Sequence, residues 1–95
     1  MPNVPFEPEQ RVRIRPDEVT WRSVGDEVIV LDMRTWEYMG LNGSGATLWP
    51  ALVEGATPAA LGDLLVETYG IDRGTAGRDV EAFLTSLRES QLLAA

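Results

Sequence analysis

A chain of 95 residues is long enough for one folded domain and too short for two. It contains neither cysteine nor histidine, which excludes disulfides, thiolate metal sites, cysteine nucleophiles and Ser-His or Cys-His catalytic pairs. The formal net charge of −7 argues against nucleic acid as a partner, because affinity for phosphates comes largely from lysine and arginine.

The N-terminal residues predict an extended arm in front of the domain. Residues 1–10 contain three prolines, so we expect an arm there and a domain formed by residues 11–95. Glu7 and Glu9 stand where a signal peptide would need positive charge followed by an apolar run. No stretch approaches membrane-spanning length, so we expect a cytoplasmic protein with no membrane partner.

Strand patterns occupy the first half of the domain. The segment "RVRIR" at 11–15 alternates arginine with aliphatic residues, which predicts a half-exposed edge strand. The β-type segment "VTWRSV" follows, and "EVIVLD" at 27–32 has the four consecutive aliphatic residues of a central strand. We expect Met33-Arg34 to be a short hairpin connection to an antiparallel strand from about Thr35 to Leu41.

Three helices are predicted in the second half. The first covers about 44–53 and should be short or kinked, because Pro50 lacks an amide donor. The second begins at Thr57-Pro58 and ends at Gly70, and the third takes Thr75 as its N-cap. Apolar residues recur at helical spacing in the third: Val80, Phe83, Leu84 and Leu87. The fold class is therefore α+β, a three-stranded antiparallel sheet followed by three helices that cover one sheet face.

Enzymatic chemistry finds little support in these residues. Paired acids such as Asp26 and Glu27 are typical of turns and exposed faces. The segment "GLNGSG" lacks the lysine of a phosphate-binding loop, and a strand-to-helix turn explains it without a ligand. Ser44 does not lie in a G-x-S-x-G elbow and has no histidine to activate it. We expect no catalytic residue, no metal and no cofactor.

The order of strands and helices also suggests a winged helix, which makes DNA binding a competing hypothesis. Its recognition helix would be residues 75–93, which contain two arginines and three acidic residues and so have a net charge of −1. A helix that reads a DNA groove should be basic, so the surface disfavours this function.

Peptide binding is the remaining class of function. If the strand at 35–41 lies at a sheet edge, its unpaired amides and carbonyls form a template for an added strand. Aromatic and methionine side chains beside that edge would supply anchoring pockets. The alternative is that Trp36, Tyr38 and Met39 simply complete the core, as aromatic clusters usually do.

The motifs together resemble those of PqqD-like proteins. These motifs are "VIVLD", "WEYMGLNGSGATLWPAL" and "DVEAFLTSLRESQLL", which cover most of the chain from about residue 12 to 93. Pro50 departs from the pattern, because a helix-friendly residue is expected after the helix tryptophan. The resemblance implies a winged-helix-like recognition element that binds the leader of a ribosomally synthesised precursor peptide, most like the stand-alone B1 proteins of lasso-peptide pathways.

In that family the leader adds as a strand to the third strand and lies against the third helix. The resemblance therefore implies leader-binding residues in both elements: Arg34, Thr35, Trp36, Glu37, Tyr38, Met39, Leu41, Ala76, Asp79, Val80, Phe83, Leu84 and Leu87. Period-2 alternation separates Tyr38 from Met39 and Leu41. We expect Leu41 to point towards the helices, Met39 to neighbour the groove, and Tyr38 to lie on the other face or at the rim.

The implied function is non-catalytic capture of the leader and its delivery to a separate B2-type leader peptidase, with the lasso macrocyclase as a further candidate partner. The alternative within the family is a peptide chaperone for a radical SAM enzyme in pyrroloquinoline quinone biosynthesis. The alternative outside it is the winged-helix DNA-binding protein.

Overall fold

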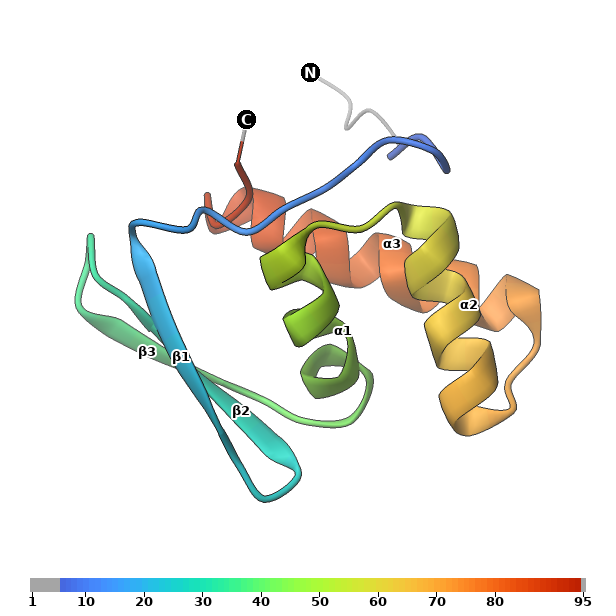
Figure 1. Cartoon of the computed structure of the whole chain (residues 1–95), viewed down its shortest axis with the longest axis horizontal. Helices are drawn as coiled ribbons and strands as arrows, with labels where there is room; N and C mark the ends of the chain where they lie inside the picture. Colours follow the sequence, from blue (N-terminus) through green and yellow to red (C-terminus); the bar gives the residue numbers. More distant parts are fainter. Residues whose placement is uncertain (1–5, 95) are drawn as a thin grey trace.

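The computed structural model describes residues 6–94 and contains one sheet and three helices. The strands are joined antiparallel in the order β1-β2-β3, and the helices gather on one side of the sheet (Figure 1). In chain order the elements are β1 Val19–Val24, β2 Glu27–Asp32, β3 Glu37–Leu41, α1 Gly43–Glu54, α2 Pro58–Tyr69 and α3 Arg73–Glu89. The predicted α+β fold class is confirmed.

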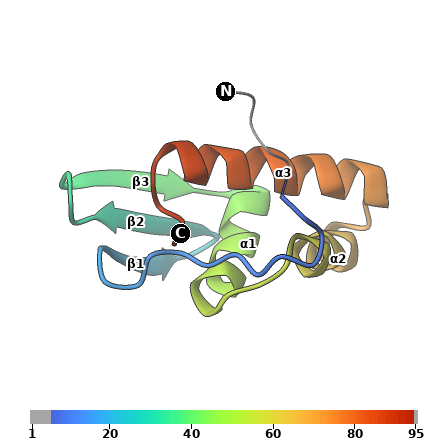
Figure 2. The same cartoon turned by 90° about the horizontal axis from the view of Figure 1, so that it is seen from above.

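The segment 11–15 is not an edge strand of this sheet, so that prediction is wrong. Val12 forms an isolated antiparallel bridge with Ala56, and Ile14 forms another with Leu93. Val12 N donates to the Ala56 carbonyl at 2.8 Å, and Ala56 N donates back at 2.9 Å. The alternation itself is real, because Val12 and Ile14 are buried, whereas Arg11 and Arg13 are exposed and Arg15 is half-buried. The segment crosses the helical side of the molecule (Figure 2). Ile14 N donates to the Leu52 carbonyl of α1 at 3.1 Å, and Arg15 N donates to the Leu92 carbonyl of the C-terminal tail at 2.9 Å.

The described part of the predicted arm packs against the helices. The Phe6 ring packs against the core, and the guanidinium carbon of Arg88 lies 4.3 Å from its centroid. Ala59 N, in the first turn of α2, donates to the Pro8 carbonyl at 3.1 Å. The extended tip expected for residues 1–5 lies outside the described residues, and a domain boundary at residue 10 stays a prediction.

Capping residues set the bounds of α2 and α3. The Thr57 side chain accepts a hydrogen bond from Ala60 N, and Gly70 ends α2 in the left-handed conformation at φ 67°, both as predicted. The N-cap of α3 is Asp72 rather than Thr75, so α3 begins earlier than expected. The Asp72 carboxylate accepts from Thr75 N at 2.9 Å and from Thr75 Oγ1 at 2.9 Å, which places Thr75 inside the first turn.

Pro50 led to the expectation of a short or kinked helix, and the short alternative is wrong for helix α1. It spans 12 residues and continues through this exposed proline to Glu54. Leu48, Trp49 and Leu52 are buried on one face of the helix. Core packing therefore stabilises the helix before and after Pro50, which has no amide donor.

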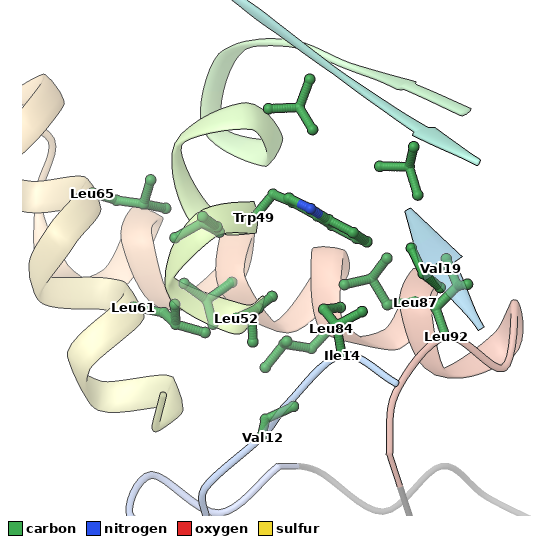
Figure 3. Packing of buried hydrophobic residues seen from close by; sticks show 14 of the residues in the cluster. Val12, Ile14, Val19, Trp49, Leu52, Leu61, Leu65, Leu84, Leu87 and Leu92 are labelled. Atoms are coloured by element: carbon green, nitrogen blue, oxygen red, sulfur yellow. The ribbon is translucent and has the colours of Figure 1, made fainter. Parts of the chain in front are cut away.

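The core lies between the inner face of the sheet and the three helices (Figure 3). Trp49 of α1 is its largest fully buried side chain, and the 11–15 segment closes the core by inserting Val12 and Ile14. Its most deeply buried leucines are Leu48, Leu52, Leu61, Leu65 and Leu84. The sheet and helices therefore form one packing unit that fixes where β3 and α3 lie.

The hairpin before β3 is longer than predicted. Residues 33–36 form a four-residue turn, and β3 begins at Glu37. Trp36 N donates to the Asp32 carbonyl at 2.8 Å, and Trp36 has a φ of 61°. Thr35 and Trp36 therefore belong to the turn, although their β-forming character predicted a strand.

Candidate functional site

The hydrogen bonds between strands reveal which backbone groups of β2 face β3. Met33 N, directly after β2, donates to the Glu18 carbonyl at 2.8 Å, so residue 33 turns its backbone towards the β1 side. Successive residues of an antiparallel strand turn to opposite neighbours. Counting back from Met33, residues 29 and 31 face β1, whereas Val28, Val30 and Asp32 face β3.

The register carries this alternation onto β3. Val28, Val30 and Asp32 pair with Leu41, Met39 and Glu37 in that order, so these three β3 residues direct their amides and carbonyls towards β2. Tyr38 and Gly40 direct theirs away from the sheet. In the described part of the chain no hydrogen bond joins the backbone of Tyr38 or Gly40 to another element. The outer edge of β3 is thus open at two consecutive outward positions.

Helix α3 runs beside this open edge, on the side of β3 away from β2 (Figure 2). A groove of about 340 Å³ lies between β3 and the end of α3. Its β3 side includes Glu37, Tyr38 and Met39, and its α3 side is formed by the helix end and the following turn, residues 89–92. An open strand edge therefore faces a groove with a second wall.

The side chains of β3 alternate as the pattern predicted. Met39 lines the groove and is half-buried against the core, whereas Tyr38 is 74% exposed and stands at the rim. Leu41 points towards the helices, where an atom added at Gly45 would lie 3.6 Å from Leu41 and 3.3 Å from Phe83. Phe83 of α3 and Leu41 therefore meet over the start of α1.

Arg34 ties the hairpin turn to the end of α3. Its Nε and Nη2 atoms donate to the two Asp32 oxygens at 3.1 and 2.8 Å, and Nη2 also donates to the Ser90 carbonyl at 3.0 Å. Nη1 donates to Gln91 Oε1 at 3.4 Å, and Glu18 Oε2 lies 3.2 Å from Nε. The hydrogen bond from Arg34 lowers the pKa of Asp32 below its ordinary value. This cluster joins both sides of the groove at its hairpin end.

The predicted residues of α3 divide between surface and core. Asp79 is exposed and Phe83 is half-buried, so both offer surface to a ligand. The other four are at most 2% exposed and give a ligand almost no surface in this conformation: Ala76, Val80, Leu84 and Leu87. Ala76 and Val80 also line a separate hollow towards α2, away from the β3 groove. These four residues pack in the core and so hold α3 in place beside β3.

Sequence reasoning missed two parts of the candidate site, one on the open edge of β3 and one in the groove beside it. Gly40 was passed over because it has no side chain, although its backbone is one of the two outward positions on β3. Residues 89–92 were read only as the end of the third helix, whereas the turn that breaks it, with Gln91 at φ 61°, supplies groove surface. The end of the apolar period at Leu87 was the signal available for that turn.

Residues 6–94 contain neither a candidate metal cluster nor a candidate membrane-spanning helix. Within these residues no group of three or more Asp, Glu, His or Cys side chains is placed to hold a metal ion. No helix in this part of the chain has the length and apolar character needed to cross a bilayer.

Comparison with known proteins identifies the family of this chain. The family model described as coenzyme PQQ synthesis protein D (PqqD) matches residues 27–93. The solved structure "TbiB1 in Complex with the TbiA(beta) Leader Peptide" is 35% identical with a TM-score of 0.80, and the match covers 87% of this chain and 95% of that one. "Lasso peptide synthetase B1 complexed with the leader peptide" is 32% identical with a TM-score of 0.76, covering 88% and 98%. A search of curated proteins gives no significant match. By its sequence and by its fold, the chain belongs to the PqqD family.

Proposed function

We propose that the protein binds the leader region of a ribosomally synthesised precursor peptide, of the kind found in lasso-peptide pathways, as a strand added to β3. The observation that carries this proposal is the open edge at Tyr38 and Gly40 beside α3. Two solved relatives with more than 30% identity are described as complexes with leader peptides.

The edge suits a peptide because its geometry exists before binding. Backbone hydrogen bonds to Tyr38 and Gly40 supply affinity that is independent of peptide sequence, and side-chain pockets supply specificity. The side chains proposed to meet the leader are those accessible along β3, its turn and the outer face of α3: Arg34, Thr35, Trp36, Glu37, Tyr38, Met39, Leu41, Asp79 and Phe83. The buried set Ala76, Val80, Leu84 and Leu87 holds the helix wall in place.

The role is non-catalytic. The protein holds the leader and presents the precursor to a separate B2-type leader peptidase, with the macrocyclase as a further partner. Tethering raises the local concentration of the cleavage site around the peptidase, so no cofactor is needed. We expect that incubation with this protein alone leaves the precursor intact and that accelerated cleavage requires the peptidase.

A second candidate rests on the family model, whose description refers to PQQ synthesis. In that case the same edge binds the precursor of pyrroloquinoline quinone and presents it to a radical SAM enzyme. The two candidates share the binding mode and differ in the peptide.

The experiment is a calorimetric titration of the purified protein with the synthetic leader of the precursor encoded beside its gene. A peptide with the same composition in scrambled order is the matched control. Saturable one-to-one binding of the leader, without saturable binding of the scrambled peptide, supports the proposal. If the lasso-type leader fails and a PQQ-precursor peptide binds, the second candidate replaces the first. Binding of neither peptide contradicts both.

A further inference from the structure

The outer face of the sheet, on the side away from the helices, carries apolar residues where polar ones are usual. An antiparallel sheet with one solvated face normally alternates apolar residues inward and polar residues outward. In β2 the inward residues Val28 and Val30 are buried, yet the outward residues Ile29 and Leu31 are also aliphatic and only half-buried. This face has apolar surface that the folded domain leaves uncovered.

A hollow of about 290 Å³ lies on this face. The register places Tyr38, Leu31 and Thr20 in one row across the strands and Gly40, Ile29 and Arg22 in the next. The hollow is lined by Thr20, Trp21, Arg22, Ile29, Leu31 and Tyr38. The outward residues of this wall are the aliphatic Ile29 and Leu31 together with Tyr38, Thr20 and Arg22, whereas Trp21 pairs with the inward Val30.

Gly40 opens this hollow towards the β3 edge. A Cβ atom placed on Gly40 would meet only Ile29 Cδ1, at 4.0 Å, so the space above Gly40 on the outer face is empty. Every other outward position in the two rows carries a side chain. A group that approaches from the β3 edge can therefore cross over Gly40 and reach Ile29 beside the exposed Tyr38 ring.

A strand added to β3 would send side chains to this face. Residues that lie opposite each other on adjacent strands share a face of the sheet. The peptide residue opposite Gly40 therefore projects outward, whereas its neighbours project towards the groove beside α3. Both faces of the added strand then meet the protein.

We propose that the leader residue opposite Gly40 is a large apolar side chain, preferably aromatic, that crosses over Gly40 and fills the hollow between Tyr38 and Ile29. This inference rests on the proposed function and adds a specificity site to it. An aromatic ring that covers a glycine on the neighbouring strand is a recognised means of stabilising strand pairs. Arg22 favours an aromatic over an aliphatic occupant, because a guanidinium attracts the face of a ring.

The test compares Gly40→Leu with Gly40→Ala in leader titrations. The leucine fills the space above residue 40 and keeps the backbone donor, whereas the single methyl of alanine makes only ordinary contact with Ile29. Gly40→Leu weakens leader binding about tenfold, the scale of one well-packed anchor side chain, and Gly40→Ala stays close to the parent. A folded Gly40→Leu variant that binds the leader like the parent contradicts the assignment of the hollow as a leader subsite. The proposed function then still stands, because the leader binds.

An alanine scan of the leader identifies the occupant. Truncation of one large apolar leader residue to alanine should weaken binding to the parent protein. The same truncation should have little effect on binding to Gly40→Leu, because that variant has already lost the contact. If no leader residue shows this coupling, the hollow is not a leader subsite. If Gly40→Leu fails to fold, Ile29→Thr is the replacement variant, because it keeps a β-branched residue and makes the Ile29 surface of the hollow polar. Unchanged affinity of a folded Ile29→Thr variant also overturns the inference.

Discussion

Trp36 combines a strained backbone with an exposed aromatic side chain. Its φ of 61° lies in the left-handed region, and its side chain is 71% exposed. The left-handed conformation costs a residue with a Cβ atom about 1–2 kcal/mol, and glycine avoids this cost. Strain of this kind concentrates at functional sites, which agrees with the place of Trp36 next to the groove.

Replacing Trp36 separates the strain from the side chain. The free energy of unfolding of Trp36→Gly should be about 1 kcal/mol higher than that of Trp36→Ala, because only glycine adopts the left-handed conformation without strain. Urea unfolding of both variants measures the difference. An alanine variant as stable as the glycine variant would show that the turn stores no backbone strain.

The interaction of Asp32 with Arg34 makes the stability of the fold depend on pH. Because Arg34 lowers the pKa of Asp32 in the folded state, this carboxylate stabilises the fold fully above its unfolded pKa of about 3.9. The contribution is lost as the pH falls from about 4 through the lower folded-state pKa. Asp32→Asn should therefore be less stable than the parent at pH 7 and lose less stability than the parent between pH 5 and pH 2.

Chemical unfolding across this pH range tests the prediction. Asp26→Asn, in the exposed β1–β2 turn, is the control for removal of an acid outside the Arg34 cluster. Equal pH slopes for the parent and Asp32→Asn would contradict a stabilising Asp32–Arg34 interaction.

At the scale of elements, the backbone direction in β3 predicts opposite tolerances at adjacent positions. Proline removes an amide donor, and sheets accept it only where that donor faces outward. Met39 directs its amide towards Val30 of the central strand, whereas Tyr38 directs its amide to the open edge. Met39→Pro should lose at least about 1 kcal/mol of stability for the missing ladder bond, and Tyr38→Pro should lose less.

Thermal or urea unfolding of the two proline variants gives the answer. Met39→Leu keeps the apolar volume and the amide, and serves as the control for the methionine side chain. A Tyr38→Pro variant that is less stable than Met39→Pro would reverse the assigned directions.

Most elements could be predicted from sequence because their signals are local. Thr57 and Gly70 cap α2 through their own side-chain and backbone preferences, and the alternation of 11–15 correctly gave its buried residues. The partner of 11–15 could not be predicted, because Ala56 and Leu93 meet it only through the tertiary fold. The start of β3 was placed two residues early, since β-forming Thr35 and Trp36 conceal a turn.

The site was predictable as a region but less so by residue. The β3 edge and α3 were both expected, and the structure places a groove between them. The resemblance assigned leader binding to the face of α3 that carries the apolar repeat, and Val80, Leu84 and Leu87 of that repeat pack in the core. The direction of strand amides depends on register with β1 and β2, and no single-strand pattern contains it.

At the scale of the whole molecule, charge separates this winged-helix-like fold from DNA-binding proteins. The net charge is −7, and Glu37 and Glu89 line the groove beside the open edge. Neutralising phosphates requires a basic surface, so we predict no binding of generic duplex DNA at physiological salt. Fluorescence anisotropy with a labelled duplex checks this, and a complex that weakens steeply as salt increases would contradict it.

The central claim is that a leader peptide adds as a strand at the outward backbone of Tyr38 and Gly40. The most direct measurement is leader affinity of Tyr38→Pro beside Tyr38→Phe, with circular dichroism to confirm that both are folded. Proline removes one outward donor, which leaves a peptide carbonyl unpaired at a cost of about 1–3 kcal/mol, or roughly 5- to 150-fold in affinity. Phenylalanine keeps the amide and the ring, so Tyr38→Phe should bind nearly as the parent does. A folded Tyr38→Pro variant that binds the leader with parental affinity would contradict strand addition at this edge.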